Sequence, residues 1–536
     1  MKIKNINGIC RLDFERKMAG KVELRRSIVL ACVSGLCWLA QGFGQANLGN
    51  STTLPAFIKH FPMLDSAAEG ITDSQKSQRS LLSGFVVAVY ELGLSGGGLS
   101  TYFVGDWLGR RNTAYAAAVI VIIGTLLQSA SYSLGQLIVG RIVAGWGIGA
   151  FTATVPAWMT ETAIASHRGP IVLSGNGFAI TGVASMSWIC LGMYRNQFDT
   201  EFAWRFPLAL QGILAIVVIG AISFLSDSPR SLVRRNKRDK AYNVLKRNRH
   251  GESEEEVQKE FEEIILAYEN ELKTKDKSPW SFNEHKQFRR TVTAIILSGL
   301  CQWAGINLIT FYGAIIFEDD IGLSVIRSRV ALAGLQTWQA IGGISSVFFV
   351  IKFGRRNLVL ICSAVMCICF CCCAGLDSDD SVDTKYGILA FDAIQLAAFP
   401  IGLLVNPFLI GSEIAGLLCR SAVMAGVASI NWLMNFVLAL VTKLAFQEIG
   451  YKYYTVFVAT NATLFLFAFF FVPETGKLTL EEVDQGYVNS KHPFDIVKCM
   501  KAIEAAEHVP PEPLQRSESK KGTESVEMIE DVEKGI

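Results

Sequence analysis

Two ionised side chains of opposite sign lie within long apolar stretches of the sequence. Glu91 lies near the middle of the apolar run Leu81–Phe103, and Arg141 divides two stretches that contain no other charged residue. A charged residue at the centre of a membrane helix costs about 2.5–3.5 kcal/mol on insertion scales, and such residues commonly pair or serve a function. Glu91 is therefore the acid predicted to carry a proton if the protein moves protons, with Arg141 as its partner and Asp392 as the next candidate. A permanent Glu91–Arg141 salt bridge that only holds helices together fits the same residues.

A second group of charges repeats in the same order in the first and second parts of the chain. Each part has a Gly-Arg-Arg turn and, further on, a Glu followed seven residues later by an Arg. The positive-inside rule explains the bases as topology signals but leaves the paired acids unexplained. We therefore expect ion pairs between the two parts that close the cytoplasmic side and break when that side opens. The expected gate residues are Asp106, Arg110, Arg111, Glu161, Arg168, Arg355, Arg356, Glu413 and Arg420.

No arrangement of residues in the sequence points to an enzyme or a metal centre. The six histidines lie outside or at the edges of the apolar runs and form no metal-ligand motif. Most of the 13 cysteines lie inside apolar runs, where a thiol behaves as a small hydrophobe. The Gly96-Gly97-Gly98 segment lacks the lysine of a nucleotide-binding loop and lies within an apolar run, so close helix packing is its expected role. We expect neither catalysis nor a bound cofactor.

The composition is that of an integral membrane protein. Of the 536 residues, 51% are hydrophobic and only 18% are charged, whereas roughly a quarter of the residues of a soluble domain are charged. The net charge of +2 provides no basic surface for nucleic acid. The expected partners are therefore the lipid bilayer and a small molecule.

The apolar stretches predict twelve transmembrane helices. Ten stretches without any charged residue are long enough to cross a bilayer, which takes about 20 residues. Two further runs, Leu81–Phe103 and Gly387–Ser412, contain one acid each. Basic residues before the first run, and in the segment Arg230–Arg290, place the N-terminus and this segment in the cytoplasm by the positive-inside rule.

The order of these elements divides the chain into two similar halves. We expect a cytoplasmic N-terminal segment (1–26), a six-helix half (27–226), a cytoplasmic helical linker (227–289), a second six-helix half (290–472) and a cytoplasmic tail (473–536) that is disordered from residue 509. Apolar residues between Val257 and Leu272 recur at helical spacing, which predicts an amphipathic helix that packs under the membrane bundle. Duplicated halves suit alternating access, with a site near the midplane between them.

Several motifs in this order resemble those of the sugar porter family of the major facilitator superfamily, in particular the fungal sugar and polyol permeases. The similarity extends from about Ser27 to Asp484 and implies an all-α membrane protein with the major facilitator fold. The motifs are Gly105-Asp106-Trp107-Leu108-Gly109-Arg110-Arg111, Gly140-Arg141 with Pro156 and Glu161, Arg168-Gly169, Ser228-Pro229-Arg230, Gln302-Trp303-Ala304-Gly305-Ile306-Asn307, Asn431-Trp432, Pro473-Glu474-Thr475 and Val89-Tyr90-Glu91-Leu92-Gly93.

The resemblance implies a substrate pocket made of amides and aromatic rings. An amide both donates and accepts hydrogen bonds, so it can replace the water around a hydroxyl, and an aromatic face can cover the apolar face of a sugar. Amides that bond helices together are the alternative for any one residue, but they explain the whole set less well. The residues at matching positions are Gln302, Asn307, Asn431, Asn435, Gln339, Asn176, Phe399 and Phe408.

The sequence departs from the family pattern at positions that bear on substrate and coupling. Gly44 stands where the family has Asp or Asn in the first helix, Cys301 replaces the first of two paired glutamines, and Pro400 replaces a frequent Glu. These differences leave the choice of sugar, and the choice between facilitated diffusion and proton symport, open.

The function expected from this resemblance is transport of a sugar or polyol across the plasma membrane, with both termini in the cytoplasm. One alternative is a nutrient sensor of the same fold that does not transport, although the short tail lacks a recognisable signalling module. Another is a transporter of an organic acid or exported metabolite. Asn50-Ser51-Thr52 lies in an expected external loop and is a candidate glycosylation site.

Overall fold

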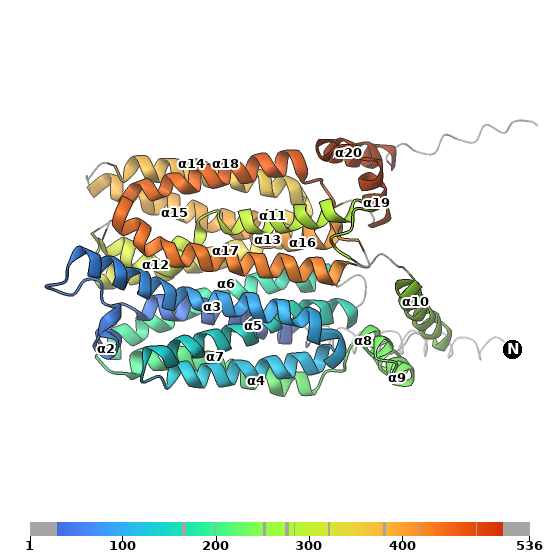
Figure 1. The fold of residues 1–536 in the computed structure, drawn as a ribbon, viewed down its shortest axis with the longest axis horizontal. Coiled ribbons are helices and arrows are strands. Elements are labelled where there is room, and N and C mark those ends of the chain that lie inside the picture. Colours follow the sequence, from blue (N-terminus) through green and yellow to red (C-terminus); the bar gives the residue numbers. More distant parts are fainter. Residues whose placement is uncertain are drawn as a thin grey trace, which may run out of the picture.

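The computed structural model describes residues 29, 31–162, 168–197, 199–249, 253–273, 278–283, 285–319, 322–378, 382–416, 419–476, 478 and 480–507. Within these residues the chain is helical and forms no strand. Most of the long helices run along the same axis in an elongated bundle (Figure 1). The all-α architecture predicted from the apolar runs is confirmed.

Six long helices form the N-terminal half, as the charge-free runs predict. The short α2 (Pro55–His60) and the 3₁₀ turn η1 (Pro62–Leu64) connect the first two. Thr72 caps the start of the second helix, since its side chain accepts from Gln75 N and the Gln75 side chain accepts from Thr72 N. The six helices are one over 31–51, α3 (Asp73–Leu108), α4 (Arg110–Ser129), α5 (Leu134–Thr162), α6 (Arg168–Gln197) and α7 (Phe202–Ser223).

The C-terminal half also crosses the bundle six times, but two of its crossings are interrupted. These two are α11 (Gln287–Gln302) with α12 (Ile306–Asp319), and α15 (Val382–Gly402) with α16 (Asn406–Ile414). The other four crossings are α13 (Val325–Phe353), α14 (Arg355–Leu376), α17 (Arg420–Ile449) and α18 (Tyr453–Phe471), with the turn η3 (Gly450–Lys452) before α18.

Twelve crossings therefore occur among the described residues. Ten helical stretches are long and apolar enough to span a membrane, and the last of them, Arg420–Phe471, contains both α17 and α18. The helix over 31–51 supplies the remaining crossing. The two halves meet where α3 packs along α17 and α6 packs along α13.

Five further helices lie at the same end of the bundle (Figure 1). The linker forms α8 (Pro229–Arg234), α9 (Arg238–Asn248) and α10 (Glu254–Lys273), and the tail forms α19 (Leu480–Asn489) and α20 (Ile496–Glu507), with the turn η4 (Pro493–Asp495) between these two. α10 is the predicted amphipathic helix, and Val257 and Phe261 pack on Leu232 and Leu245 of α8 and α9. Two tail helices were not expected from the polar sequence. The expected disorder of 509–536 lies outside the described residues.

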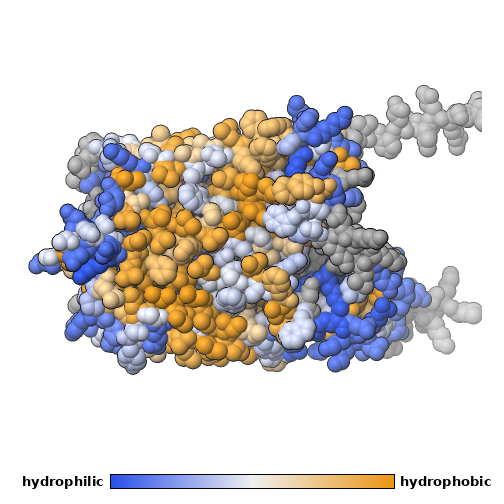
Figure 2. Space-filling view, in the orientation of Figure 1, coloured by the Kyte–Doolittle hydropathy of each residue, from blue (hydrophilic) through white to orange (hydrophobic). Residues whose placement is uncertain are grey.

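The surface of the bundle has the polarity of a membrane protein. A broad band of hydrophobic side chains crosses the middle of the face shown in Figure 2, and hydrophilic side chains gather at both ends. We call the end that carries α8–α10, α19 and α20 the linker end. The opposite end, which carries α2 and η1, is called the loop end (Figure 1).

Candidate functional site

A large cavity lies between the two halves. Its volume is about 1770 Å³, well above the 300–1,000 Å³ of a typical small-molecule pocket. The cavity is this large because it continues from the midplane to the linker end, where it is lined by Arg230, Tyr268 and Asp484. No described residue between 52 and 100 contributes to its lining. The cavity is therefore open at the linker end and closed at the loop end.

Seven of the eight predicted pocket residues line this cavity. They come from both halves, as a site between duplicated halves requires. Asn435 is buried but does not line the cavity, and lies behind Asn307. The seven lining residues are Asn176, Gln302, Asn307, Gln339, Phe399, Phe408 and Asn431.

The interruption between α11 and α12 positions two of these amides. Gly305 has φ +98, and a Cβ at this position would lie 2.6 Å from the Phe370 ring, so a larger residue would be both strained and crowded. Backbone carbonyls freed by the break accept from α18, from Thr460 Oγ1 to Trp303 O at 2.7 Å and from Asn461 Nδ2 to Ala304 O at 3.0 Å. Irregular backbone inside a membrane protein is stable only when its polar groups are satisfied in this way.

Gln302 and Asn307, on the two sides of the break, begin a chain of amide hydrogen bonds. Gln302 Nε2 donates to Asn431 Oδ1 at 2.9 Å, and Asn307 Nδ2 donates to Gln302 Oε1 at 3.0 Å. Asn307 Nδ2 also lies 2.7 Å from Asn435 Oδ1. All four side chains are at most 4% exposed. A hydroxylated solute could exchange hydrogen bonds with these four amides without leaving any of them unpaired.

The N-terminal half adds two glutamines that the sequence analysis missed. Gln45 Nε2 donates to Asn307 Oδ1 at 3.4 Å, across the interface between the halves. Gln41 Nε2 donates to Gln45 Oε1 at 2.9 Å, and both glutamines line the cavity. The signal that could have found them is their spacing, because two amides four residues apart share one face of a charge-free helix.

The second interruption, between α15 and α16, places the two aromatic rings. Phe399 lies in the last turn of α15 and Phe408 lies on α16, and both line the cavity. Pro400 lies next to the break, and its carbonyl accepts from Asn176 Nδ2 at 3.2 Å. Asn176 therefore connects α6 of one half with α15 of the other. Gln339 of α13 lines the same cavity, and its buried Oε1 has no hydrogen-bond partner among the described residues.

Glu91 and Arg141 are both buried but do not form an ion pair within salt-bridge distance in the part of the chain that the structure describes. Arg141 Nη1 donates to Gly44 O at 3.0 Å and to Asn47 Oδ1 at 2.9 Å, and Nη2 donates to Val87 O at 3.0 Å. Neither carboxylate oxygen of Glu91 makes a hydrogen bond of normal geometry to a described residue. Arg141 and the Asn435 amide of α17 lie close enough to the Glu91 carboxylate to act on it electrostatically. The permanent salt bridge considered from the sequence is therefore absent from this state.

The structure explains why residue 44 is glycine. A Cβ at Gly44 would lie 2.0 Å from the Tyr90 hydroxyl and 2.4 Å from Gln211 Nε2. These two groups are hydrogen bonded to each other at 2.8 Å. Tyr90 thus fills the space that a carboxylate or amide on the first helix would need.

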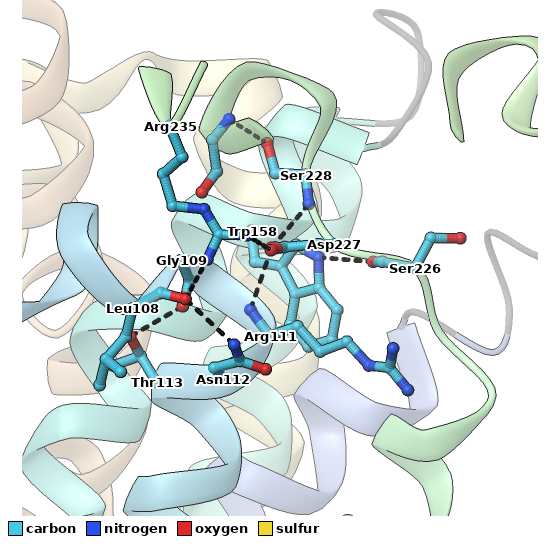
Figure 3. Close-up of polar contacts among 11 residues, drawn as sticks. Leu108, Gly109, Arg111, Asn112, Thr113, Trp158, Ser226, Asp227, Ser228 and Arg235 are labelled. Carbon is cyan, nitrogen blue, oxygen red and sulfur yellow. Dashed lines mark hydrogen bonds and ion pairs between the residues drawn. The ribbon is translucent and has the colours of Figure 1, made fainter. Parts of the chain in front are cut away.

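A cluster around Asp227 holds the linker end of the N-terminal half together (Figure 3). Asp227 Oδ1 accepts from the backbone N–H of Arg111 at 3.2 Å and of Ser228 at 2.9 Å. Oδ2 pairs with Arg235 Nη2 at 3.0 Å, and Arg235 Nη1 also donates to the Leu108 carbonyl. The exit of α7, the end of α3 and the start of α4 are thereby connected.

Glu474 occupies the position in the C-terminal half that is equivalent to Asp227 in the N-terminal half. Its Oε1 and Oε2 accept from the backbone N–H groups of Arg355 and Arg356, both at 3.0 Å. Arg356 Nη2 donates to Phe469 O at 2.9 Å, just as Arg111 Nη2 donates to Ser223 O at 3.0 Å in the other half. The repeated motifs of the sequence therefore form repeated structures.

The expected gate residues pair within each half in this state. Arg110 pairs with Glu161 at 3.3 Å, and Arg355 pairs with Glu413 at 3.1 Å. Arg420 lies within electrostatic reach of Arg230 and Glu413, and its Nε and Nη2 are buried without a described partner. Because the linker end is open, ion pairs between the halves remain a prediction for its closed state. The side chains of Asp106 and Arg168 are not among those that the structure describes.

The tail contacts the mouth of the cavity. Asp484 of α19 pairs with Arg290 Nη2 at 2.6 Å and with His285 Nδ1 at 2.8 Å. Arg290 lies 4.5 Å from the centre of the Tyr487 ring, and burial raises the pKa of Tyr487 to about 12 although the guanidinium groups of Arg290 and Arg289 oppose this. α19 is thus attached to the start of α11 in the C-terminal half.

Asn50 is placed unfavourably for the predicted glycosylation. It lies in the last turn of the helix over 31–51 rather than in a loop, and it is 5% exposed. Its Nδ2, the atom that would carry the glycan, donates to Ala46 O at 2.9 Å. In this state the folded chain therefore does not present this amide at its surface, and glycosylation of Asn50 stays a prediction.

Comparison with known proteins gives the same assignment along nearly the whole chain. Residues 28–487 match the family model described as "Sugar (and other) transporter". The MFS-type transporter oryC of Aspergillus oryzae is 30% identical over 444 residues, which cover 81% of each chain. The sugar transporter STL1 of Saccharomyces cerevisiae is 27% identical, with 94% of this chain and 87% of the relative covered.

Solved structures agree on the fold. The xylose transporter XylE of E. coli in a partially occluded inward open conformation aligns with a TM-score of 0.69 at 19% identity, covering 84% of this chain and 99% of that one. A second structure of XylE, bound to 6-bromo-6-deoxy-D-glucose, aligns with a TM-score of 0.72 at 20% identity, covering 86% and 99%. The duplicated halves, the interrupted helices and these matches together show that the chain belongs to the sugar (and other) transporter family of the major facilitator superfamily.

Proposed function

We propose that this protein carries a monosaccharide or a polyol across a membrane by alternating access, and that the state described here is inward-open. The observation that carries the proposal is the chain of amides that joins both halves at the closed end of the cavity, from the half-buried Gln45 to the buried Asn307, Gln302 and Asn431. The names of relatives such as a sugar transporter and a low-affinity glucose transporter support the same substrate class.

The proposed chemistry of binding is an exchange of hydrogen bonds. Each amide offers two donors and a carbonyl acceptor, so a sugar hydroxyl can take the place of a neighbouring amide. Phe399 and Phe408 would cover the apolar faces of the ring, where the solute loses water. A neutral solute is favoured because the cavity is lined by amides and aromatic rings at its closed end, and its charged lining residues lie toward the linker end.

The proposed orientation places the linker end in the cytoplasm. The supporting argument is the positive-inside rule, because the linker and the Gly-Arg-Arg turns carry the Lys and Arg residues that face the cytoplasm in membrane proteins. The loop end then faces the outside. We infer the plasma membrane as the location, since this is where uptake of an external sugar would take place.

Uptake of labelled hexoses, pentoses, disaccharides and polyols into cells that lack their own carriers tests this function. We expect saturable uptake of at least one class, with competition by unlabelled members of that class. A flat result across the panel at normal surface levels would contradict a sugar substrate. Uptake or export of an organic acid in the same cells would then support the alternative cargo.

A second proposal concerns coupling, with Glu91 as the acid that carries a proton. It is supported by a buried carboxylate that has no normal hydrogen bond to a described residue and that lies near Asn435, a member of the amide chain. Glu91→Gln keeps the shape and removes the charge. We expect this variant to lose accumulation against a gradient while equilibrium exchange survives.

Two results would contradict this coupling. If the wild type never accumulates substrate and its flux ignores external pH, the protein is a facilitator and Glu91 has a structural role. If Glu91→Gln accumulates substrate normally, the proton is carried elsewhere. Asp392, buried in the C-terminal half with Oδ1 unpartnered among the described residues, is the next residue to test.

A further inference from the structure

We propose that Arg329 is the latch that holds the loop end of the two halves together, and that its release is a required step when the pocket opens to the outside. This inference rests on the proposed alternating-access function. It adds a residue for which the sequence analysis gave no role.

Arg329 belongs to α13 of the C-terminal half, but its described hydrogen bonds reach the N-terminal half. Nη1 donates to Asn50 O at 3.1 Å, and Nη2 donates to Thr53 Oγ1. The guanidinium also lies 4.2 Å from the centre of the Tyr194 ring of α6. The side chain is only 3% exposed. One buried cation thus contacts both the first and the fifth crossing of the opposite half.

The chemistry of the partner explains why a cation binds there. Asn50 lies in the last turn of the helix over 31–51, where carbonyl groups lack an intrahelical donor and the helix dipole is negative. Tyr194 offers the negative face of an aromatic ring, which attracts a guanidinium. The opposite half therefore provides three complementary contacts to the guanidinium, and none of them is a carboxylate.

Opening of the loop end must break all three contacts together, since all of them cross the interface. The carboxylate that remains near the guanidinium is Glu318 of α12, which belongs to the same half as Arg329 and lies within electrostatic reach of it. Glu318 would move with Arg329 when the halves separate. We infer that it balances the charge after release, so that the latch can open without leaving a lone cation in a poorly hydrated place.

Other described contacts across the loop end either lie nearer to solvent or join neutral groups, as in Ser80 Oγ, which donates to Gln447 Oε1 at 2.5 Å. Ser77 Oγ donates to Glu448 Oε1 at 2.8 Å at an exposed position, and Lys443 Nζ donates to Ser83 Oγ at 3.2 Å at a partly buried one. Hydrogen bonds to charged groups are stronger than neutral ones and strengthen when water is excluded. Among the described contacts at this end, Arg329 should therefore set much of the bias toward the inward-open state.

The test measures how often the pocket is reachable from outside. Thr310 lines the cavity on α12, which runs from the break toward the loop end, so Thr310→Cys reports external access when the exposed Cys32 and Cys371 are replaced. We expect Arg329→Ala to increase the rate of labelling by an impermeant external thiol reagent about tenfold. The apparent affinity for external sugar should rise with it, because a larger fraction of the protein is competent to bind.

Arg327→Ala is the matched control, since Arg327 is exposed on the same helix two residues earlier. Thr53→Val and Tyr194→Leu each remove one contact and should shift labelling in the same direction by smaller factors. These variants keep the test decisive if Arg329→Ala fails to reach the membrane. A residue that merely stabilises the fold would lower the amount of protein without changing the labelling rate per molecule.

The proposal is overturned if external labelling is unchanged in Arg329→Ala, Thr53→Val and Tyr194→Leu at measurable surface levels. It is also overturned if Arg327→Ala raises labelling as much as Arg329→Ala does. The labelling assay needs no substrate, so a failure of the latch is distinguishable from a failure to find a transported sugar.

Discussion

The two ends of the molecule use polar side chains in opposite ways. At the loop end, hydrogen bonds cross between the halves, from Arg329 to Asn50 and Thr53 and from Ser80 to Gln447. At the linker end, the described ion pairs among the expected gate residues stay within a half. The cavity is accordingly closed at the first end and open at the second.

This difference shows how a symmetric fold produces an asymmetric state. The linker ends of the two halves are built alike, since Asp227 and Glu474 both accept from the backbone of a Gly-Arg-Arg turn. Such clusters keep each half rigid, so that the halves can rotate as bodies. The contacts that differ between states are then those between the halves, and they decide which end is open.

The largest expected effect comes from joining the halves at the loop end. Ser80 Oγ lies 2.5 Å from Gln447 Oε1 across the interface. We expect Ser80→Cys with Gln447→Cys, joined by a short bifunctional thiol reagent, to abolish transport, since the loop end can no longer open. A reductant that cleaves the reagent should restore uptake.

The two single-cysteine variants treated in the same way are the controls and should keep their activity. Full transport by the cross-linked protein would mean that the loop end does not open during the cycle.

The next effect concerns the amides at the closed end of the cavity. We expect Gln302→Ala and Asn431→Ala each to weaken sugar binding by about 1–3 kcal/mol, because each leaves a buried hydrogen-bonding group without its partner. Apparent affinity in uptake assays measures this at matched surface levels. Gln78→Ala, an exposed amide at the loop end, is the control. Unchanged affinity in both cavity variants would show that the pocket is elsewhere.

A smaller effect is expected at the linker end. We expect Glu161→Ala and Arg420→Ala to favour the inward-open state by about 1 kcal/mol or less, because charge pairs near solvent are weak. Ala157→Cys, which lines the cavity one turn before Glu161, should become more reactive to a thiol reagent supplied from inside. Equal reactivity with and without these substitutions would mean that the charges only set topology.

No effect is expected from a substitution at the candidate glycosylation site, Asn50. Asn50 Nδ2 is buried and hydrogen bonded, so we expect Asn50→Gln to leave the electrophoretic mobility of the protein unchanged, before and after treatment with a glycosidase. A mobility shift that the substitution removes would show that this residue is modified before the loop end closes.

The crossings and the repeat were predictable because each depends on local sequence. Charge-free runs are long enough to span the membrane, and motifs such as Gly109-Arg110-Arg111 recur at matched positions. The cavity residues were predictable only through resemblance to a family, since nothing in the spacing of Gln302 and Asn431 shows that they meet at 2.9 Å.

The contacts between the halves could not be predicted. In the sequence Arg329 only marks the start of a charge-free stretch, and its contacts depend on the approach of Asn50 and Tyr194 from elements far apart in the sequence. Gly44 likewise has a reason only in three dimensions, because the Tyr90 hydroxyl fills the space beside it. Local rules do not contain this information.

The most direct test of the account is a pair of distances, one at each end, measured by double electron–electron resonance. Spin labels at Asn112 and Asn357, exposed equivalents after the two Gly-Arg-Arg turns, report the linker end, and labels at Ser74 and Arg327 report the loop end. We predict that the Arg329→Ala substitution shortens the first distance and lengthens the second. Unchanged distances, or a change of the same sign at both ends, would contradict alternating access governed by contacts between the halves.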